Sequence, residues 1–236
     1  MLNLINVSKS YKNKKAIDNI SLEIKNGEIF GFIGHNGAGK TTTIKAIVGI
    51  HSFEEGEILI NSKSIRINPV KCKEEIAYIP DNPDIYESLT GIQYLNFIAD
   101  IFKVDKNERE KLIIEYSKKF EIDKSLGDLV SSYSHGMKQK LAIISALIHN
   151  PKILILDEPF VGLDPKASYI LKEIMKEFCV NGGSIFFSTH VLEVAEKICD
   201  KIAIIKDGKI VAYGTTEEVK GNGSLENMFM ELIDNE

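Results

Sequence analysis

The sequence of 236 residues predicts an α/β fold built around a mostly parallel sheet. Beyond residue 151, three short runs have the length and composition of buried strands: Ile153–Leu156, Ser184–Ser188 and Ile202–Ile205. Two stretches with a helical pattern, Lys166–Val180 and Val191–Cys199, separate them. Strands and helices that alternate in this way are joined by crossover connections, which make neighbouring strands parallel.

The N-terminal part begins the same fold with a strand, a loop and a helix in succession. The apolar segment Ile29–Ile33 leads into a glycine-rich turn, and a helical pattern follows over Lys40–Ile50. Three further β-type runs surround this unit, at Leu2–Val7, Ile20–Ile24 and Glu57–Ile60. We therefore expect the glycine-rich turn to lie at the junction of a buried strand and a helix.

The pattern becomes helical between residues 86 and 150. Leu95, Ile98 and Phe102 recur at spacings of three and four, as one face of a helix requires. Residues 225–233 have the pattern of a short amphipathic helix. Because no repeat or linker divides the chain, we expect one domain over residues 1–236. Its parts are a core of residues 1–85 and 151–220, a helical part of residues 86–150 and a C-terminal helix within residues 221–236.

Composition excludes few functions. The longest apolar runs, such as Ile153–Leu156, are far shorter than the ~20 residues that cross a bilayer, so any work at a membrane needs a partner there. The net charge of −5, with mixed signs along the chain, argues against a nucleic-acid partner. Three widely spaced cysteines, without a metal-ligand pattern, favour a reducing cytoplasm.

A phosphate-binding loop occupies the glycine-rich turn. Its residues match G-x-x-x-x-G-K-[ST] and are Gly34, His35, Asn36, Gly37, Ala38, Gly39, Lys40 and Thr41, followed by Thr42. Glycines let the backbone curl so that N–H groups point at a phosphate, and the helix N-terminus adds positive potential. We expect Lys40 to reach the β- and γ-phosphates and Thr41 to ligate Mg²⁺. The loop also occurs in kinases, GTPases and motor ATPases, so alone it predicts a ligand and not a biological role.

Two carboxylates follow the buried strand Ile153–Leu156. Ligands of open α/β sheets gather at this edge, so we assign Asp157 to the metal and Glu158 to the general base that deprotonates water. A second strand ends at His190, whose imidazole is placed to bond the γ-phosphate. A solvated turn at the acidic pair and a merely polar strand end at His190 are the alternatives.

With Tyr133-Ser134-His135-Gly136-Met137 upstream of the acidic pair, the sequence resembles the nucleotide-binding domains of ABC ATPases, whose signature reads Leu-Ser-Gly-Gly-Gln. Ser134 and Gly136 match by identity. The order of the other motifs supports the resemblance: phosphate loop, signature, acidic pair, then Gly162-Leu163-Asp164 and His190. The family's fold is a P-loop NTPase core with a mostly parallel sheet, an N-terminal antiparallel β subdomain and an inserted α-helical subdomain.

The resemblance implies further site residues and the cofactors ATP and Mg²⁺. Ser134 and Gly136 would bind a phosphate of ATP held by the opposite subunit of a dimer. Tyr11 corresponds to the aromatic residue that stacks on adenine, with an ordinary strand tyrosine as the alternative. Asp81 stands where the family usually has a glutamine that contacts Mg²⁺ or water, and an ionised aspartate can bind metal but cannot donate a hydrogen bond.

The resemblance implies that the chain is the ATP-hydrolysing subunit of an ABC transporter. An integral membrane subunit would hold it at the cytoplasmic face of the membrane. The partner would dock near Asp81–Phe102, and the second ATPase subunit would be an identical copy or a relative. The sequences of the segments Tyr86–Gly91 and Gly136–Lys140 look most like those of the exporter-type branch of the family. The alternatives are a soluble ABC-type ATPase acting on translation or DNA, and a regulatory ATP-binding module with little turnover.

Overall fold

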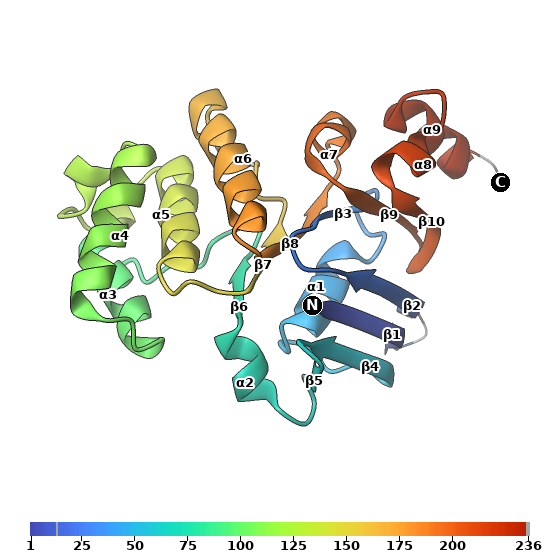
Figure 1. Cartoon of the computed structure of the whole chain (residues 1–236), viewed down its shortest axis with the longest axis horizontal. Helices are drawn as coiled ribbons and strands as arrows, with labels where there is room; N and C mark the ends of the chain where they lie inside the picture. Colours follow the sequence, from blue (N-terminus) through green and yellow to red (C-terminus); the bar gives the residue numbers. More distant parts are fainter. Residues whose placement is uncertain (13, 235–236) are drawn as a thin grey trace.

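Two sheets organise the chain in the computed structural model, which describes residues 1–12 and 14–234 (Figure 1). The smaller sheet is antiparallel and has the strand order β2-β1-β4-β5. Its strands are β1 (Leu2–Tyr11), β2 (Lys14–Ile24), β4 (Glu55–Ile60) and β5 (Lys63–Ser64). The prediction of β-structure at the N-terminus is confirmed, and β1 and β2 are longer than predicted because their polar outer ends pair with each other.

The larger sheet has the strand order β10-β9-β3-β8-β7-β6. All its neighbouring pairs are parallel except β10 and β9, which are antiparallel. The strands are β3 (Ile29–Ile33), β6 (Ile76–Ile79), β7 (Ile153–Asp157), β8 (Ser184–Thr189), β9 (Lys201–Lys206) and β10 (Lys209–Thr215). The predicted α/β class with a mostly parallel sheet is therefore confirmed.

Helices lie around both sheets and form a separate group at one end (Figure 1). That group consists of α3 (Gly91–Ile101), α4 (Lys106–Lys119) and α5 (His135–Leu147). The others are α1 (Lys40–Ile47), α2 (Pro69–Glu74), α6 (Pro165–Val180), α7 (Leu192–Ile198), α8 (Thr216–Lys220) and α9 (Leu225–Asp234), with short 3₁₀ turns at Asp123–Ser125 and Val130–Ser132. Within residues 1–12 and 14–234, no helix has the combined length and apolar character that a membrane span requires.

Both faces of the larger sheet are buried at its inner strands β3, β7 and β8, which explains the continuous apolar runs of these strands. In β3, Phe30 and Phe32 face the core shared with the smaller sheet and α1, whereas Ile29 and Ile33 face the core under α5 and α6. The Phe30 ring stacks on Phe186 of β8, with centroids 5.7 Å apart. Each of these side chains contributes about 1.5–3 kcal/mol when fully buried, so β3 is held rigidly from both sides.

Local signals set several helix ends. Thr90 and Gln93 form a reciprocal capping box at the start of α3. The side chain of Asp164 accepts a hydrogen bond of 2.8 Å from the Ala167 N–H and caps α6. Helix α1 ends at Ile47, so the predicted end at Ile50 is wrong. Gly49 has a φ of 69° and closes the helix with a bond from its N–H to the Ala46 carbonyl.

Candidate nucleotide-binding site

The phosphate loop joins β3 to α1 and depends on its glycines. Gly37 and Gly39 have φ values of 84° and 113°, a region that favours glycine. A Cβ atom on Gly39 would lie 2.4 Å from the Ala16 carbonyl oxygen, and one on Gly34 would lie 2.5 Å from the Ile205 carbonyl oxygen. The loop is thus wedged between β2 and β9, where only glycine leaves enough space.

The hairpin between β9 and β10 supports the loop from outside. Asp207 and Gly208 both have positive φ, as a two-residue Asp-Gly hairpin turn between two strands requires. The Gly208 N–H donates to the Ala38 carbonyl at 2.9 Å, and the Gly208 carbonyl accepts from the Asp18 N–H at 2.8 Å. One turn therefore ties the phosphate loop to β2.

The ammonium group of Lys40 lies inside the curl of the loop. Its Nζ donates to the Gly34 carbonyl at 2.7 Å and to the His35 carbonyl at 3.3 Å, and the residue is buried. Glu158 Oε1 lies 3.6 Å away. Among the described residues, the side chain of His35 bonds only to its neighbour, through Nδ1 to the Asn36 carbonyl at 2.8 Å.

A polar cavity of about 300 Å³ opens above Lys40. Eight residues of the predicted site line it: Asn36, Gly37, Gly39, Lys40, Thr41, Thr42, Asp81 and Glu158. Gly34 and Ala38 belong to the same loop but are buried and do not line the cavity. Sequence reasoning missed Lys14 and Ala16, which form the wall on the β2 side and belong to no recognisable motif. The cavity is therefore lined by four separate segments of the chain, which are β2, the phosphate loop, the loop after β6 and the residue after β7.

Asp157 is completely buried at the end of β7. Its Oδ1 accepts a hydrogen bond from Ser188 Oγ, and its Oδ2 has no partner among the described residues. Burial raises the pKa of Asp157 above its ordinary value, although the hydrogen bond from Ser188 and the nearby Thr41 hydroxyl lower it. A buried carboxylate oxygen left unpaired beside a threonine hydroxyl suits a hard cation such as Mg²⁺, which prefers oxygen ligands.

Glu158 follows the strand in a left-handed conformation, with a φ of 49°. Ser188 accepts the Glu158 N–H through both its carbonyl oxygen, at 3.2 Å, and its hydroxyl, at 3.1 Å. The turn directs the Glu158 carboxylate toward His190, whose Nδ1 lies 3.0 Å from Oε2. Ser188 thus fixes both acids, a role that sequence reasoning missed because it depends on the pairing of Asp157 with Ser188 across β7 and β8.

Asp81 reaches the same cavity from the loop after β6. Its negative charge contributes to the raised pKa of Asp157, so the two carboxylates are electrostatic neighbours. The Asp81 Oδ1 accepts a hydrogen bond of 2.9 Å from the Asn82 N–H. The structure therefore places Asp81 at the predicted site, where its negative charge would favour a cation.

Comparison with known proteins agrees with this geometry. Residues 17–161 match the model of the ABC transporter family. The chain belongs to this family. It is 35% identical over 237 residues to the ABC-type transporter ATP-binding protein EcsA of Bacillus subtilis, an alignment that covers 98% of this chain and 96% of EcsA. The resemblance based on the motif order is thus confirmed.

Solved structures of ABC proteins have the same fold. A structure described as the ATP binding subunit of an ABC transporter is 34% identical, has a TM-score of 0.95 and covers 99% of both chains. A dimeric ATP-binding cassette in a post-hydrolysis state, bound to ADP and Pi, is 27% identical, with a TM-score of 0.83, over 92% of this chain and 99% of that chain. The P-loop NTPase core expected for an ABC protein is therefore confirmed.

The ABC signature lies outside the cavity. Ser134 caps α5, accepting the Met137 N–H at 3.3 Å, and neither it nor Gly136 lines the cavity. A Cβ atom on Gly136 would lie 2.8 Å from the Gly162 carbonyl oxygen, so the signature packs on the loop that follows Glu158. Within one chain, the structure does not bring the signature and the phosphate loop together.

Tyr11 is also absent from the cavity wall of this ABC protein. It ends β1, where its exposed ring makes an edge contact with His51, with centroids 6.1 Å apart. Lys9 Nζ lies 4.8 Å from the ring centre. The stacking of Tyr11 on adenine stays a prediction.

Proposed function

We propose that this protein hydrolyses ATP and thereby powers an ABC transporter. The observation that carries the proposal is that one polar cavity brings together Lys40 and Glu158 close to Asp157, whose Oδ2 has no hydrogen-bond partner among the described residues. Lysine and backbone donors bind phosphate oxygens, while a carboxylate beside them activates water. A regulatory module with little turnover would not need this base.

Each side chain has a defined task in the proposed reaction. The loop amides and Lys40 hold the phosphates, and Thr41 and Asp157 would hold Mg²⁺, which supplies neutralising charge when bound. Glu158 accepts the proton of the attacking water. His190, which lies 3.0 Å from the Glu158 carboxylate, orients that base and bonds the γ-phosphate.

We propose that a second ATPase subunit completes the site. Ser134 and Gly136 stand away from the cavity of their own chain, yet the cap of α5 offers backbone donors and positive helix potential. The similar cassette with bound ADP and Pi is dimeric, which supports this arrangement. An identical copy or a relative would present its signature to ATP held by this chain, and closure on ATP would supply the mechanical step.

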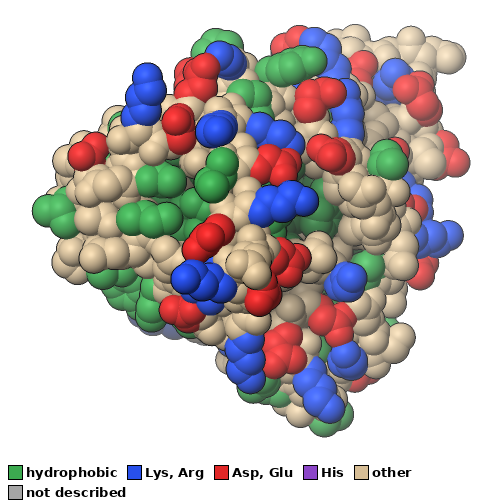
Figure 2. Space-filling model, turned by 60° about the vertical axis from the view of Figure 1, so that its left-hand side comes forward, with side chains coloured by type: hydrophobic (Ala, Val, Ile, Leu, Met, Phe, Trp, Pro, Cys, Tyr) green, Lys and Arg blue, Asp and Glu red, His purple; other side chains and the backbone are tan. Residues whose placement is uncertain are grey.

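The partner at the membrane would dock on the helical end of the molecule. Tyr86, Phe97 and Ile101 are exposed there, and Tyr86 and Phe97 contact each other edge to face. Figure 2 turns this end toward the viewer and shows hydrophobic side chains at the surface among charged ones. Exposed apolar groups of this kind suit an integral membrane subunit. We place the protein at the cytoplasmic face of the membrane, with export as the expected direction.

The substitution Glu158→Gln tests the proposal. It should leave ATP affinity within about twofold of the wild type but lower turnover at least about 100-fold, the usual contribution of a general base. Glu173→Gln, on the exposed side of α6, is the matched control and should hydrolyse ATP normally. Undiminished turnover in Glu158→Gln contradicts the general-base role.

Purification from native membranes tests the transport role. Recovery of an integral membrane protein with the chain supports it, and ATPase activity should change when that protein is present. Recovery of ribosomes or DNA instead would favour the soluble class of ABC-type ATPases.

A further inference from the structure

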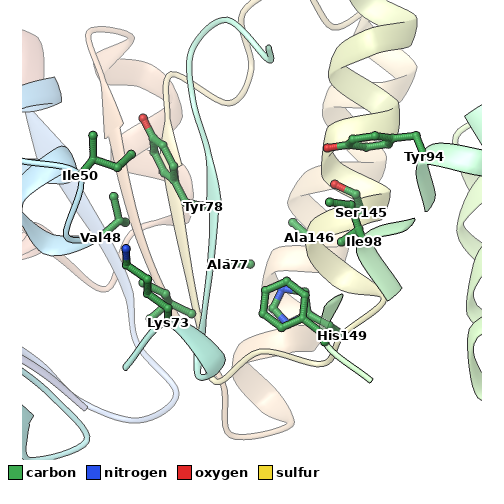
Figure 3. A pocket seen from close by; sticks show the side chains of 12 residues that line it. Val48, Ile50, Lys73, Ala77, Tyr78, Tyr94, Ile98, Ser145, Ala146 and His149 are labelled. Atoms are coloured by element: carbon green, nitrogen blue, oxygen red, sulfur yellow. The ribbon is translucent and has the colours of Figure 1, made fainter. Parts of the chain in front are cut away.

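Tyr78 lines a second cavity, and its strand β6 leads to Asp81 of the nucleotide site. This cavity has a volume of about 290 Å³ and separates β6 from the helices α3 and α5. Figure 3 shows Tyr78 on one wall of the cavity and Tyr94, Ser145 and His149 on the other. The Tyr78 ring therefore forms part of a groove between the sheet and the helical group.

The hydroxyl of Tyr78 is buried and has no hydrogen-bond partner among the residues that the structure describes. Buried tyrosine hydroxyls usually find a partner, so this one is available to a water molecule in the groove or to a side chain that approaches it. Tyr94 lies beside Ser145 on the opposite wall. His149 Nδ1, on the same opposite wall, is also buried without a partner among the described residues, so each wall of the groove carries a polar atom with unused hydrogen-bonding capacity.

Two carboxylates of the proposed metal site lie near Tyr78 in the sheet, one at the end of its own strand and one at the end of the neighbouring strand. Asp81 follows it by three residues, directly after β6. On the neighbouring strand, Ile79 pairs with Leu156, which precedes Asp157. Burial, and then the negative charges of Asp157 and Asp81, raise the pKa of Tyr78. The phenol consequently stays protonated and acts only as a donor toward these acceptors.

We propose that Tyr78 is a positioning residue whose hydroxyl orients the Asp81 carboxylate, directly or through one water molecule, toward Mg-ATP. The inference rests on the proposed function, because it needs Asp81 to act at the metal site. A short aspartate has two equivalent acceptor oxygens and no donor of its own, so a fixed neighbouring donor is required to select one orientation. Asn82 N–H supplies one such bond, and Tyr78 would supply the second.

The substitution Tyr78→Phe removes only the hydroxyl and keeps the ring on the groove wall. Titration of a fluorescent ATP analogue, in EDTA and then with Mg²⁺, measures how much Mg²⁺ improves nucleotide affinity. We expect unchanged affinity in EDTA and a loss of about fivefold in the Mg²⁺-dependent gain, the size of one ordinary hydrogen bond. Tyr94→Phe, which deletes a buried hydroxyl across the same groove, should keep the full gain.

A double substitution separates positioning from a structural effect. Asp81→Ala should lose the same Mg²⁺-dependent gain, and adding Tyr78→Phe to it should cause no further loss. An equal loss in both backgrounds, a full gain in Tyr78→Phe, or a wild type whose ATP affinity ignores Mg²⁺ overturns the proposal. Because the readout is binding, a wild type that binds Mg-ATP without hydrolysing it would contradict the proposed function and leave this inference standing.

Discussion

Lys40 Nζ lies 3.6 Å from Glu158 Oε1, so the proposed phosphate ligand and the proposed base form an ion pair in the structure. Both side chains are largely buried, at 7% and 14% exposure. The two charges attract each other strongly because little water surrounds them. Removing one partner is destabilising, because the other charge then stays buried and unpaired. A phosphate group that enters the loop would bind Lys40 and release Glu158 toward water, which couples nucleotide binding to the freeing of the base.

The substitution Lys40→Ala should weaken ATP binding about 10- to 100-fold, because it removes a charge-assisted hydrogen bond to phosphate. Calorimetric titration with ATP measures the loss. Lys176→Ala is the control, since Lys176 is exposed and pairs only with Glu173 on the same helix in the described structure. Wild-type affinity in Lys40→Ala would contradict the placement of the phosphates.

Two glycines of the loop should respond differently to alanine. Both have positive φ, but a Cβ on Gly37 would meet no atom within 4 Å, whereas one on Gly39 would lie 2.4 Å from the Ala16 carbonyl oxygen. Gly37→Ala should lower the free energy of unfolding by about 1 kcal/mol from backbone strain alone. Gly39→Ala should lower it by about 3 kcal/mol or more, because the clash adds to the strain. Urea denaturation measures both, and equal losses would contradict the predicted difference.

The sequence predicts those parts of the fold and site that depend on local patterns. The phosphate loop, the Asp207-Gly208 turn and the parallel strands follow from spacing and residue type. In contrast, Ser188 fixes Asp157 and Glu158 only through the register of two strands that are 27 residues apart in sequence, between Asp157 and Ser184. The orphaned Tyr78 hydroxyl depends on tertiary packing in the same way. Such contacts have no periodicity or motif that a single sequence displays.

His149 should make the folded protein sensitive to mild acid. Its ring stacks on Phe102 with centroids 3.7 Å apart, and burial lowers the pKa of His149 to about 4. The unfolded chain, with a pKa near its ordinary value of 6.5, binds a proton at a higher pH than the folded chain does. Stability is therefore fully present above pH 6.5 and is lost as the pH falls toward 4.

The size of this effect can be isolated by comparing variants. Between pH 7 and pH 5, the wild type should lose about 2 kcal/mol of unfolding free energy more than His149→Gln does. Urea denaturation at both pH values gives the difference, and His51→Gln reports the effect of removing a histidine elsewhere. An identical loss in the wild type and in His149→Gln would show that His149 does not stay neutral in the folded state.

Complementation between two inactive variants tests whether the signature acts across a dimer. Ser134→Arg would place a bulky cation where α5 presents its donors, and Lys40→Ala would disable the phosphate loop, so each variant alone should be nearly inactive. In a mixed dimer, the intact loop of the Ser134→Arg chain would face the intact signature of the Lys40→Ala chain. Random mixing should therefore restore up to roughly a quarter of wild-type turnover, since half of the dimers are mixed and each has one of two sites intact.

The matched control puts both substitutions in one chain and mixes that chain with the wild type. Its mixed dimers have no intact site if the signature acts across the interface, because one site lacks Lys40 and the other faces the altered Ser134. If the signature served its own loop instead, these dimers would keep the wild-type site, and the first mixture would stay inactive. The two arrangements therefore predict opposite results for the same pair of mixtures, and steady-state ATPase rates decide between them.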